Sequence, residues 1–174
     1  MRSDIQSYPL SWHPETGGKL APIVFRDDIT KSLGDDPTGR RFQKIKSKIL
    51  SGNYYPSDAV QFTPTETPLK PGTRIFQRAP MIPGLPWPCA TSITEIFIAE
   101  ETPNSFHIGY VTTSRHHGRG IWQAKITHHK NCELEIRVWS TAMPNSFLFW
   151  LGLPWARYLQ LRARRRAIEE FQKI

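Results

Sequence analysis

The residues best suited to chemistry form a short basic cluster at Arg115, His116, His117 and Arg119. A histidine can accept or release a proton near neutral pH, so His116 and His117 are candidate general acids or bases. The flanking arginines disfavour a protonated imidazole and therefore favour a neutral base. The alternative is a solvent-exposed loop tip in which these side chains do no chemistry.

Four residues just before this cluster alternate along the chain: Phe106, Ile108, Tyr110 and Thr112. Alternate side chains of a β-strand point to the same face, so these four are predicted to share one. Hydroxyl groups placed among apolar side chains are typical of a site that orients an apolar ligand. A sheet core whose hydroxyls are satisfied internally is the alternative interpretation.

Two further segments offer candidate site residues. The stretch MIPGLPWP at 81–88 cannot form a regular strand, because proline lacks an amide donor and has a fixed φ angle. We interpret it as a loop, either a lid on the core or, through Trp87, part of a pocket mouth. Glu95 would be a candidate base if it faced inward, although an outward orientation is the favoured expectation.

The spacing of the histidines does not favour a metal site. His116–His117 and His128–His129 are adjacent pairs, and neighbouring side chains on a strand point to opposite faces. Cys89 and Cys132 lack the spacing of a zinc site and are expected to be free thiols. No phosphate-binding glycine motif or nucleophile elbow is present in the sequence, so neither a metal nor a cofactor is predicted.

A run of antiparallel strands is needed to position these residues. Residues 105–142 predict three consecutive strands, 73–79 alternates in the same way, and 89–101 is expected to form a longer strand. In the last strand one face is apolar and includes Ser140, whereas the other face is charged. The sequence therefore predicts an antiparallel sheet over 73–142 with one covered side.

Helices are predicted on both sides of this run. Asp36, followed by proline, suits a helix start, and apolar residues at helical spacing predict a helix at 37–51. A second helix is predicted at 154–173, after a helical turn at 145–152. Residues 1–22 are expected to form an arm that ties onto a sheet edge.

Shorter elements complete the predicted layout. A short strand is expected at 22–26, followed by a loop up to the first helix, and another at 60–63. Together these elements predict one α+β domain over 1–174, in which the last helix covers the apolar face of the sheet.

The chain of 174 residues carries a net charge of +8, and much of the excess lies in arginines at 157–166. These arginines form a solvated helix face, a contact for an anionic ligand or partner, or a membrane-surface contact through 147–166. Nucleic acid is not a predicted partner, because the arginines span several helix faces and no binding module is present. No apolar run is long enough to span a bilayer, and a cytoplasmic location is expected.

Two segments resemble a known family: GYVTTSRHHGRG at 109–120 and WSTAMPNSFLFWLGLPWARYLQLRARRR at 139–166. They are similar to the domain of unknown function (DUF) 1990 family, which has a Tyr-Gly-Thr-Leu-Pro-Gly-His stretch, a strand with Phe-Ser-Arg-Pro, and a helix with Pro, Gln and several Arg. The positions that match are Tyr110, Thr112, His116, Gly120, Ser140, Leu151, Pro154, Arg157, Gln160 and Arg166.

This resemblance implies a helix-grip fold of the START-like and Bet v 1-like superfamily. Such proteins wrap a curved antiparallel sheet around a long C-terminal helix and hold apolar ligands between them, and some are cyclases. The chain departs from the family at Ile121 and Trp122, where the family has two acids. A more apolar pocket is therefore expected.

These observations predict a protein that binds a small hydrophobic molecule in an internal pocket, with Phe106, Ile108, Thr112, Trp87 and Ser140 as ligand-binding residues. Whether it is also an enzyme stays open. An enzyme of this kind would catalyse a cyclisation, dehydration or isomerisation by acid–base chemistry.

In that enzyme His116 would be the base, Tyr110 and Thr112 would orient the substrate, and Arg115 would bind an oxyanion or carboxylate. The alternative is a non-catalytic carrier of a lipid or other hydrophobic ligand, or a membrane-peripheral binding protein. A scaffold protein with a filled core is a third interpretation.

Overall fold

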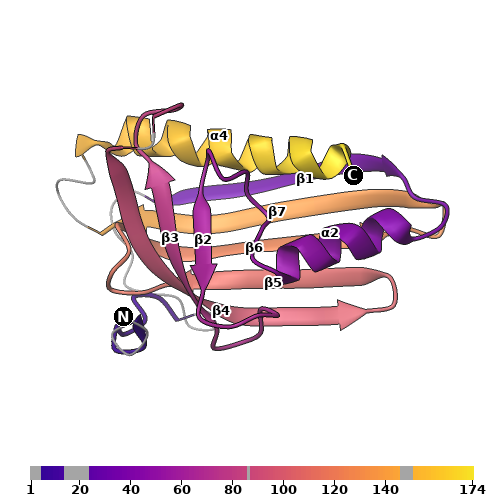
Figure 1. Cartoon of the computed structure of the whole chain (residues 1–174), viewed down its shortest axis with the longest axis horizontal. Helices are drawn as coiled ribbons and strands as arrows, with labels where there is room; N and C mark the ends of the chain where they lie inside the picture. Colours follow the sequence, from indigo (N-terminus) through magenta and orange to yellow (C-terminus); the bar gives the residue numbers. More distant parts are fainter. Residues whose placement is uncertain (1–4, 14–23, 86, 146–150) are drawn as a thin grey trace.

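The computed structural model describes residues 5–13, 24–85, 87–145 and 151–174, in which seven antiparallel strands form one curved, open sheet (Figure 1). Neighbouring strands follow the order β1-β7-β6-β5-β4-β3-β2. Two helices, α2 and α4, lie on the same side of this sheet (Figure 1). The elements are β1 (Phe25–Asp35), α2 (Arg40–Leu50), β2 (Gln61–Pro64), β3 (Arg74–Pro80), β4 (Cys89–Thr102), β5 (Ser105–Thr112), β6 (Gly118–His128), β7 (Glu133–Pro144) and α4 (Leu153–Gln172).

The predicted fold class, a curved antiparallel sheet with a long C-terminal helix, is confirmed. The three strands predicted within 105–142 are β5, β6 and β7, and each pairs with the next. The final helix, predicted at 154–173, runs from Leu153 to Gln172 with a proline in its first turn. Most of the helical turn predicted at 145–152 lies outside the described residues.

The prediction of a short first strand followed by a loop was wrong. Strand β1 continues through eleven residues and pairs with β7 from Phe25 opposite Ala142 to Asp35 opposite Glu133. It is an edge strand, so polar and charged side chains on its outer face stay in water. Its aspartates and Gly34 have low strand propensity, which hid the strand from a propensity argument.

The first helix begins later than predicted. Gly39, with a left-handed φ of 69°, precedes the first helical residue, Arg40. Asp36 nevertheless acts on the helix, because its carboxylate accepts a hydrogen bond from the backbone N–H of Phe42 at 2.8 Å. The predicted apolar stripe is buried, with Ile45 and Ile49 beside Phe42.

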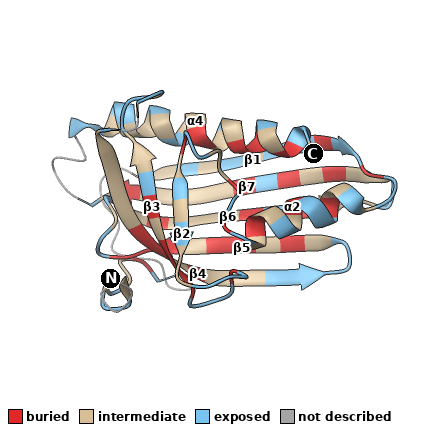
Figure 2. Ribbon diagram, in the orientation of Figure 1, coloured by how far each residue is buried: buried red, intermediate tan, exposed pale blue. Residues whose placement is uncertain are grey.

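The main core lies between the two helices and one face of the sheet (Figure 2). Ile108 and Ile136 of the sheet, Ile45 of α2 and Phe171 of α4 all belong to it. A small second cluster forms on the other face, where Trp12 of the N-terminal arm packs with Val111 and Met143. The described part of the arm thus covers the outer face of the sheet.

Candidate functional site

A cavity of about 240 Å³ lies between α4 and the half of the sheet away from α2. Small side chains line it from the sheet, the loops and the helix, and they leave space that larger core residues fill elsewhere. The small residues on its walls are Ala59, Ala79, Ala90, Ser92, Gly118, Gly120, Ala142, Ala156 and Ala163.

One row of paired residues crosses the floor of this cavity. Tyr110 of β5 lies opposite Trp122 of β6, Trp122 opposite Ser140 of β7, and Ser140 opposite Asp27 of β1. All four line the cavity. The antiparallel register therefore places an aromatic half and a polar half side by side on one floor.

The aromatic half consists of stacked rings. Trp122 stacks on Tyr110 with ring centroids 5.2 Å apart, and Tyr55 packs edge-on against Phe62 at 5.4 Å. Burial raises the pKa values of the Tyr55 and Tyr110 phenols, so both hydroxyls stay protonated at neutral pH. This wall offers apolar area together with two neutral hydrogen-bonding groups.

The polar half is built on Asp27. Arg157 of α4 forms a two-pronged ion pair with the Asp27 carboxylate, and Ser140 contributes a hydroxyl at 3.4 Å. A second guanidinium, Arg164, lies 3.6 Å from the same carboxylate. The hydrogen bond from Arg157 lowers the pKa of Asp27, against the opposing effect of burial, so Asp27 is ionised at neutral pH.

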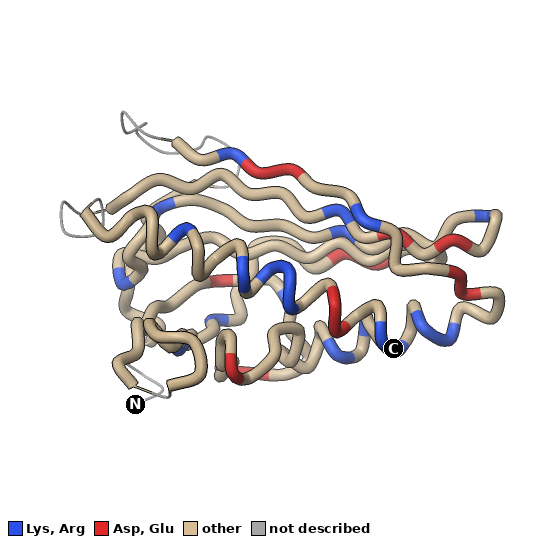
Figure 3. Tube along the Cα trace, turned by 90° about the horizontal axis from the view of Figure 1, so that it is seen from above, with Lys and Arg blue, Asp and Glu red and all other residues tan. Residues whose placement is uncertain are grey.

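The arginine-rich helix is therefore more than a solvated face (Figure 3). Arg157 and Arg164 pair with Asp27 of β1, and Arg166 pairs with Asp58, which precedes β2, at 2.9 Å. These ion pairs tie α4 to the first strand and to the loop after α2. Both attachments flank the cavity.

His116 lines the cavity beside the start of β6. Its ring Nδ1 lies 2.8 Å from the carbonyl oxygen and 3.0 Å from the amide nitrogen of Gly118. Burial lowers the pKa of His116 to about 4, although the hydrogen bond to Gly118 partly opposes this effect. The imidazole is therefore neutral at physiological pH.

The Thr112 hydroxyl lines the cavity but is held by its neighbours. It accepts a hydrogen bond from the Gly120 amide at 2.9 Å, donates to the Gly120 carbonyl at 3.2 Å, and lies 2.8 Å from the Ser11 hydroxyl. Gly120 has a φ of +150°, and a Cβ there would lie 1.8 Å from the Thr141 carbonyl oxygen. Thr112 and Gly120 thus fix the start of β6.

The structure brings six of the candidate residues together at the cavity: Tyr110, Thr112, His116, His117, Arg119 and Ser140. Phe106 and Ile108 share the face of Tyr110, as expected, but they lie in the filled core beside α2 and not in the cavity lining. Trp87 is 76% exposed and does not line the cavity.

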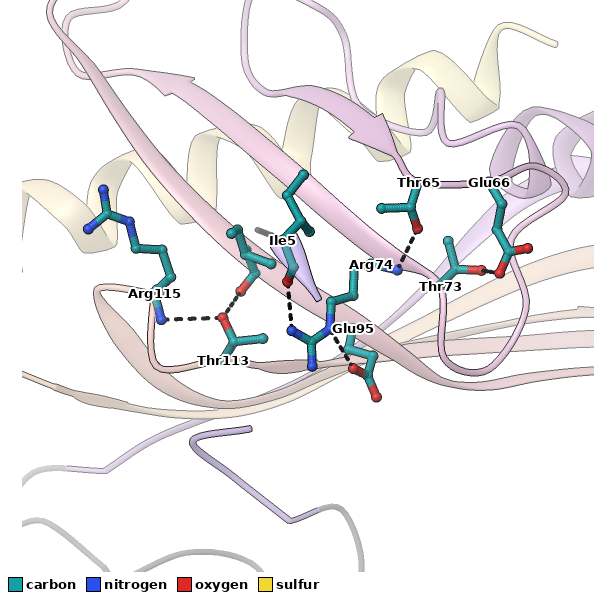
Figure 4. Close-up of polar contacts among 9 residues, drawn as sticks. Ile5, Thr65, Glu66, Thr73, Arg74, Glu95, Thr113 and Arg115 are labelled. Carbon is teal, nitrogen blue, oxygen red and sulfur yellow. Dashed lines mark hydrogen bonds and ion pairs between the residues drawn. The ribbon is translucent and has the colours of Figure 1, made fainter. Parts of the chain in front are cut away.

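Two charged candidates lie away from the cavity (Figure 4). Arg115 is exposed, and its backbone N–H donates to the Thr113 hydroxyl at 3.3 Å. Glu95 pairs with Arg74 at 2.8 Å, while Arg74 also donates to the carbonyl of Ile5 in the N-terminal arm. Glu95 therefore lies on the face of the sheet that the N-terminal arm covers, where it holds Arg74 against the arm.

The sequence reasoning missed Asp27, Tyr55 and Arg164 as cavity residues. Asp27 was assigned to a loop, so its place opposite Ser140 was not visible. Arg164 was recognised only as one of a run of arginines. No group of three potential metal-binding side chains is found within the described ranges. No helix there is long and apolar enough to cross a membrane.

Comparison with solved structures shows the class of fold: the helix-grip fold of START and Bet v 1-like proteins. Human STARD10 matches with a TM-score of 0.56 at 11% identity, over 85% of this chain and 63% of that chain, so this chain spans less than two thirds of that structure. Ara h 8.0201 matches with a TM-score of 0.56 at 11% identity, over 87% of this chain and 97% of that chain. A norcoclaurine synthase from Thalictrum matches with a TM-score of 0.51 at 10% identity, over 88% of this chain and 97% of that chain.

The sequence profile of the family described as domain of unknown function (DUF1990) matches residues 12–170, and the chain belongs to this family. No curated protein sequence matches the chain significantly. At identities near 10% the solved structures show the fold alone.

Proposed function

We propose that this protein binds a small hydrophobic molecule in the cavity between α4 and the sheet. The observation that carries this proposal is the hollow itself, about 240 Å³, walled by Tyr55, Phe62, Tyr110 and Trp122. Ligand sites are typically concave, mostly apolar and supplied with a few oriented polar groups. A scaffold with a filled core would have no such space.

Filling the cavity tests this function. Ala142 lies on the cavity wall opposite Phe25, and a phenylalanine at this position would occupy the hollow. The Ala142→Phe variant should lose binding of the uncharged fluorescent probe N-phenyl-1-naphthylamine. Thr30→Phe, at an exposed position of β1, should bind the probe as the wild type does. Equal binding by all three proteins would contradict the proposal.

Acid–base catalysis is a second candidate, favoured by the neutral His116 in the cavity lining. We propose His116 as the base and Tyr110 as the orienting hydroxyl; exposed Arg115 has no part in this proposal. A base with a pKa of about 4 accepts only fairly acidic protons, so the reaction would start from an activated carbon or hydroxyl. His116→Ala with undiminished turnover of an identified substrate would eliminate this role.

A non-catalytic carrier that docks on membranes is favoured by a different observation. Trp155 of α4 donates to the Met81 carbonyl at 2.8 Å and stacks on Tyr158, so the helix start and the β3–β4 loop meet. The exposed large apolar residues of this end are Met81, Ile82, Leu85, Trp87, Leu151, Trp155 and Tyr158. Aromatic side chains of this kind suit a bilayer interface.

The membrane-surface contact expected from the sequence spans 147–166, of which 147–150 lie outside the described residues. Vesicles containing anionic lipid should co-sediment the protein at low salt and release it at high salt, because salt screens the basic residues. Trp155→Ala with Trp87→Ala should reduce this binding. Unchanged co-sedimentation of that double variant would rule out this surface.

A further inference from the structure

The cavity wall holds more positive than negative charge. Asp27 is the only acidic side chain among its described lining residues, and both Arg157 and Arg164 are directed at it. Arg157 takes both carboxylate oxygens in hydrogen bonds. Arg164 remains 3.6 Å away, beyond hydrogen-bonding distance. One carboxylate thus serves both of these guanidinium groups, and two more arginines, Arg119 and Arg162, also line the cavity. The lining therefore carries an excess of positive charge, although Arg162 lies 4.0 Å from the Asp58 carboxylate.

Water has little access to the Arg164 side chain and solvates its charge only partly. Its side chain is only 18% exposed, and it lines both the main cavity and a small pocket beside Tyr55 and Trp122. Within the described part of the chain its guanidinium makes no hydrogen bond, although it has five N–H donors. An anion that completes the contacts of such a partly shielded charge would be favoured.

A guanidinium with free parallel donors is suited to a planar anion. Carboxylates bind arginine in a two-pronged geometry, which is stronger and more directional than contact with a neutral oxygen. The excess of arginines over acids in the lining favours an anionic ligand. The aromatic rings packed together beside it, Tyr55, Phe62 and Trp122, match an apolar body.

We propose that the ligand of this cavity is a small amphipathic carboxylic acid, whose carboxylate binds Arg164 while its apolar part packs on the aromatic wall. This inference rests on the proposed binding function and specifies its ligand class. A cavity of about 240 Å³ is below the ~300–1,000 Å³ usual for drug-sized ligands, which favours a compact single-chain or aromatic acid.

Matched ligands that differ only in charge test the inference. Calorimetric titration at pH 7.5 would compare decanoate, below its micelle-forming concentration, with decanol, below its solubility limit. The wild type should bind decanoate more tightly than decanol. Arg164→Gln should weaken decanoate binding by about tenfold to a hundredfold and leave decanol binding unchanged, because only the ionic contact is lost.

The neighbouring arginine provides the control. Arg165 is exposed and does not line the cavity, so Arg165→Gln removes the same charge from the same helix without touching the site. It should bind decanoate like the wild type. If Arg165→Gln and Arg164→Gln weaken decanoate binding equally, the effect is one of net charge and the inference is wrong.

A second variant acts in the opposite direction. Asp27→Asn removes the competing carboxylate, so its two guanidinium partners become available and decanoate should bind more tightly. Circular dichroism would establish that each variant is folded. If the wild type binds decanol as tightly as decanoate, the inference fails and the binding function stands. If it binds neither, and the naphthylamine probe also fails, the binding function fails as well.

Discussion

At the scale of single residues, the environment of each polar group decides what it does. Thr112 and His116 were predicted together as site residues, and both line the cavity. The Thr112 hydroxyl is committed to Gly120, whereas the His116 ring uses only its Nδ1 side. The end of β5 and the loop after it therefore supply one hydroxyl with a structural role and one imidazole whose other ring nitrogen makes no hydrogen bond to Gly118.

The lowered pKa of His116 predicts how the free energy of unfolding depends on pH. In the unfolded chain this histidine takes up a proton near pH 6.5, but in the fold it does so only near pH 4. The unfolded state therefore binds more protons in this window, and the free energy of unfolding falls as pH drops. His116 should account for about 2 kcal/mol of the loss between pH 7 and pH 5.

Urea unfolding at both pH values measures this loss. His116→Gln should show a smaller difference between the two pH values than the wild type. His13→Gln, at an exposed position of the arm, should retain the wild-type difference. An unchanged difference in His116→Gln would mean that the imidazole is already protonated in the fold at pH 5.

Gly120 makes a second residue-scale prediction. An alanine there would place its Cβ against the Thr141 carbonyl oxygen at a φ of +150°. Gly120→Ala should lower the free energy of unfolding by about 3 kcal/mol or more, from steric overlap and backbone strain together. Gly72→Ala, which meets no atom within 4 Å, should lose only about 1 kcal/mol from its left-handed φ. Similar losses would contradict the close-approach argument.

At the scale of elements, α4 is attached by ion pairs to two carboxylates that differ in burial, Asp27 of β1 and Asp58 of the loop before β2. Asp27 is 14% exposed and Arg157 23%, whereas Asp58 is 50% exposed at the second pair. Hydrogen-bonded charges that are shielded from water interact more strongly than surface pairs. The cavity end of α4 is therefore held more firmly on the side of β1 than on the side of β2.

Double-mutant cycles check this difference. The pair Asp27→Asn and Arg157→Met should give a coupling free energy of about 2 kcal/mol in urea unfolding. The pair Asp58→Asn and Arg166→Met should give less than about 1 kcal/mol. Equal coupling energies would show that burial does not distinguish the two attachments.

The sequence predicted whether a segment is a helix or a strand wherever its apolar residues recur with a clear period. The alternation through 105–142 predicted β5, β6 and β7, and the stripe beyond Pro154 predicted α4. The first strand was predicted only over 22–26, because an edge strand needs no apolar alternation on its outer face. The acidic residue of the site was therefore not identified from the sequence. Asp27 reaches the cavity only through its pairing with Ser140, more than one hundred residues later.

At the scale of the whole molecule, a ligand in the cavity would join α4 to the sheet. A ligand that binds only the folded state stabilises it by about 2.7 kcal/mol at one hundred times its dissociation constant. For a chain of this size we expect the melting temperature to rise by about 5–10 °C with decanoate. Differential scanning fluorimetry should detect this rise in the wild type and not in Ala142→Phe; equal rises would place the ligand elsewhere.

The pairing of β1 with β7 also bears on how the protein is made. β1 precedes the other described strands along the chain, but β7, its partner strand among the described residues, is completed at Pro144. During synthesis β1 must wait unpaired on the ribosome while the five intervening strands emerge, and such distant pairing slows folding. Because Arg157 and Arg164 emerge later still, the cavity is assembled last, and a nascent chain that lacks α4 has no site to offer a ligand.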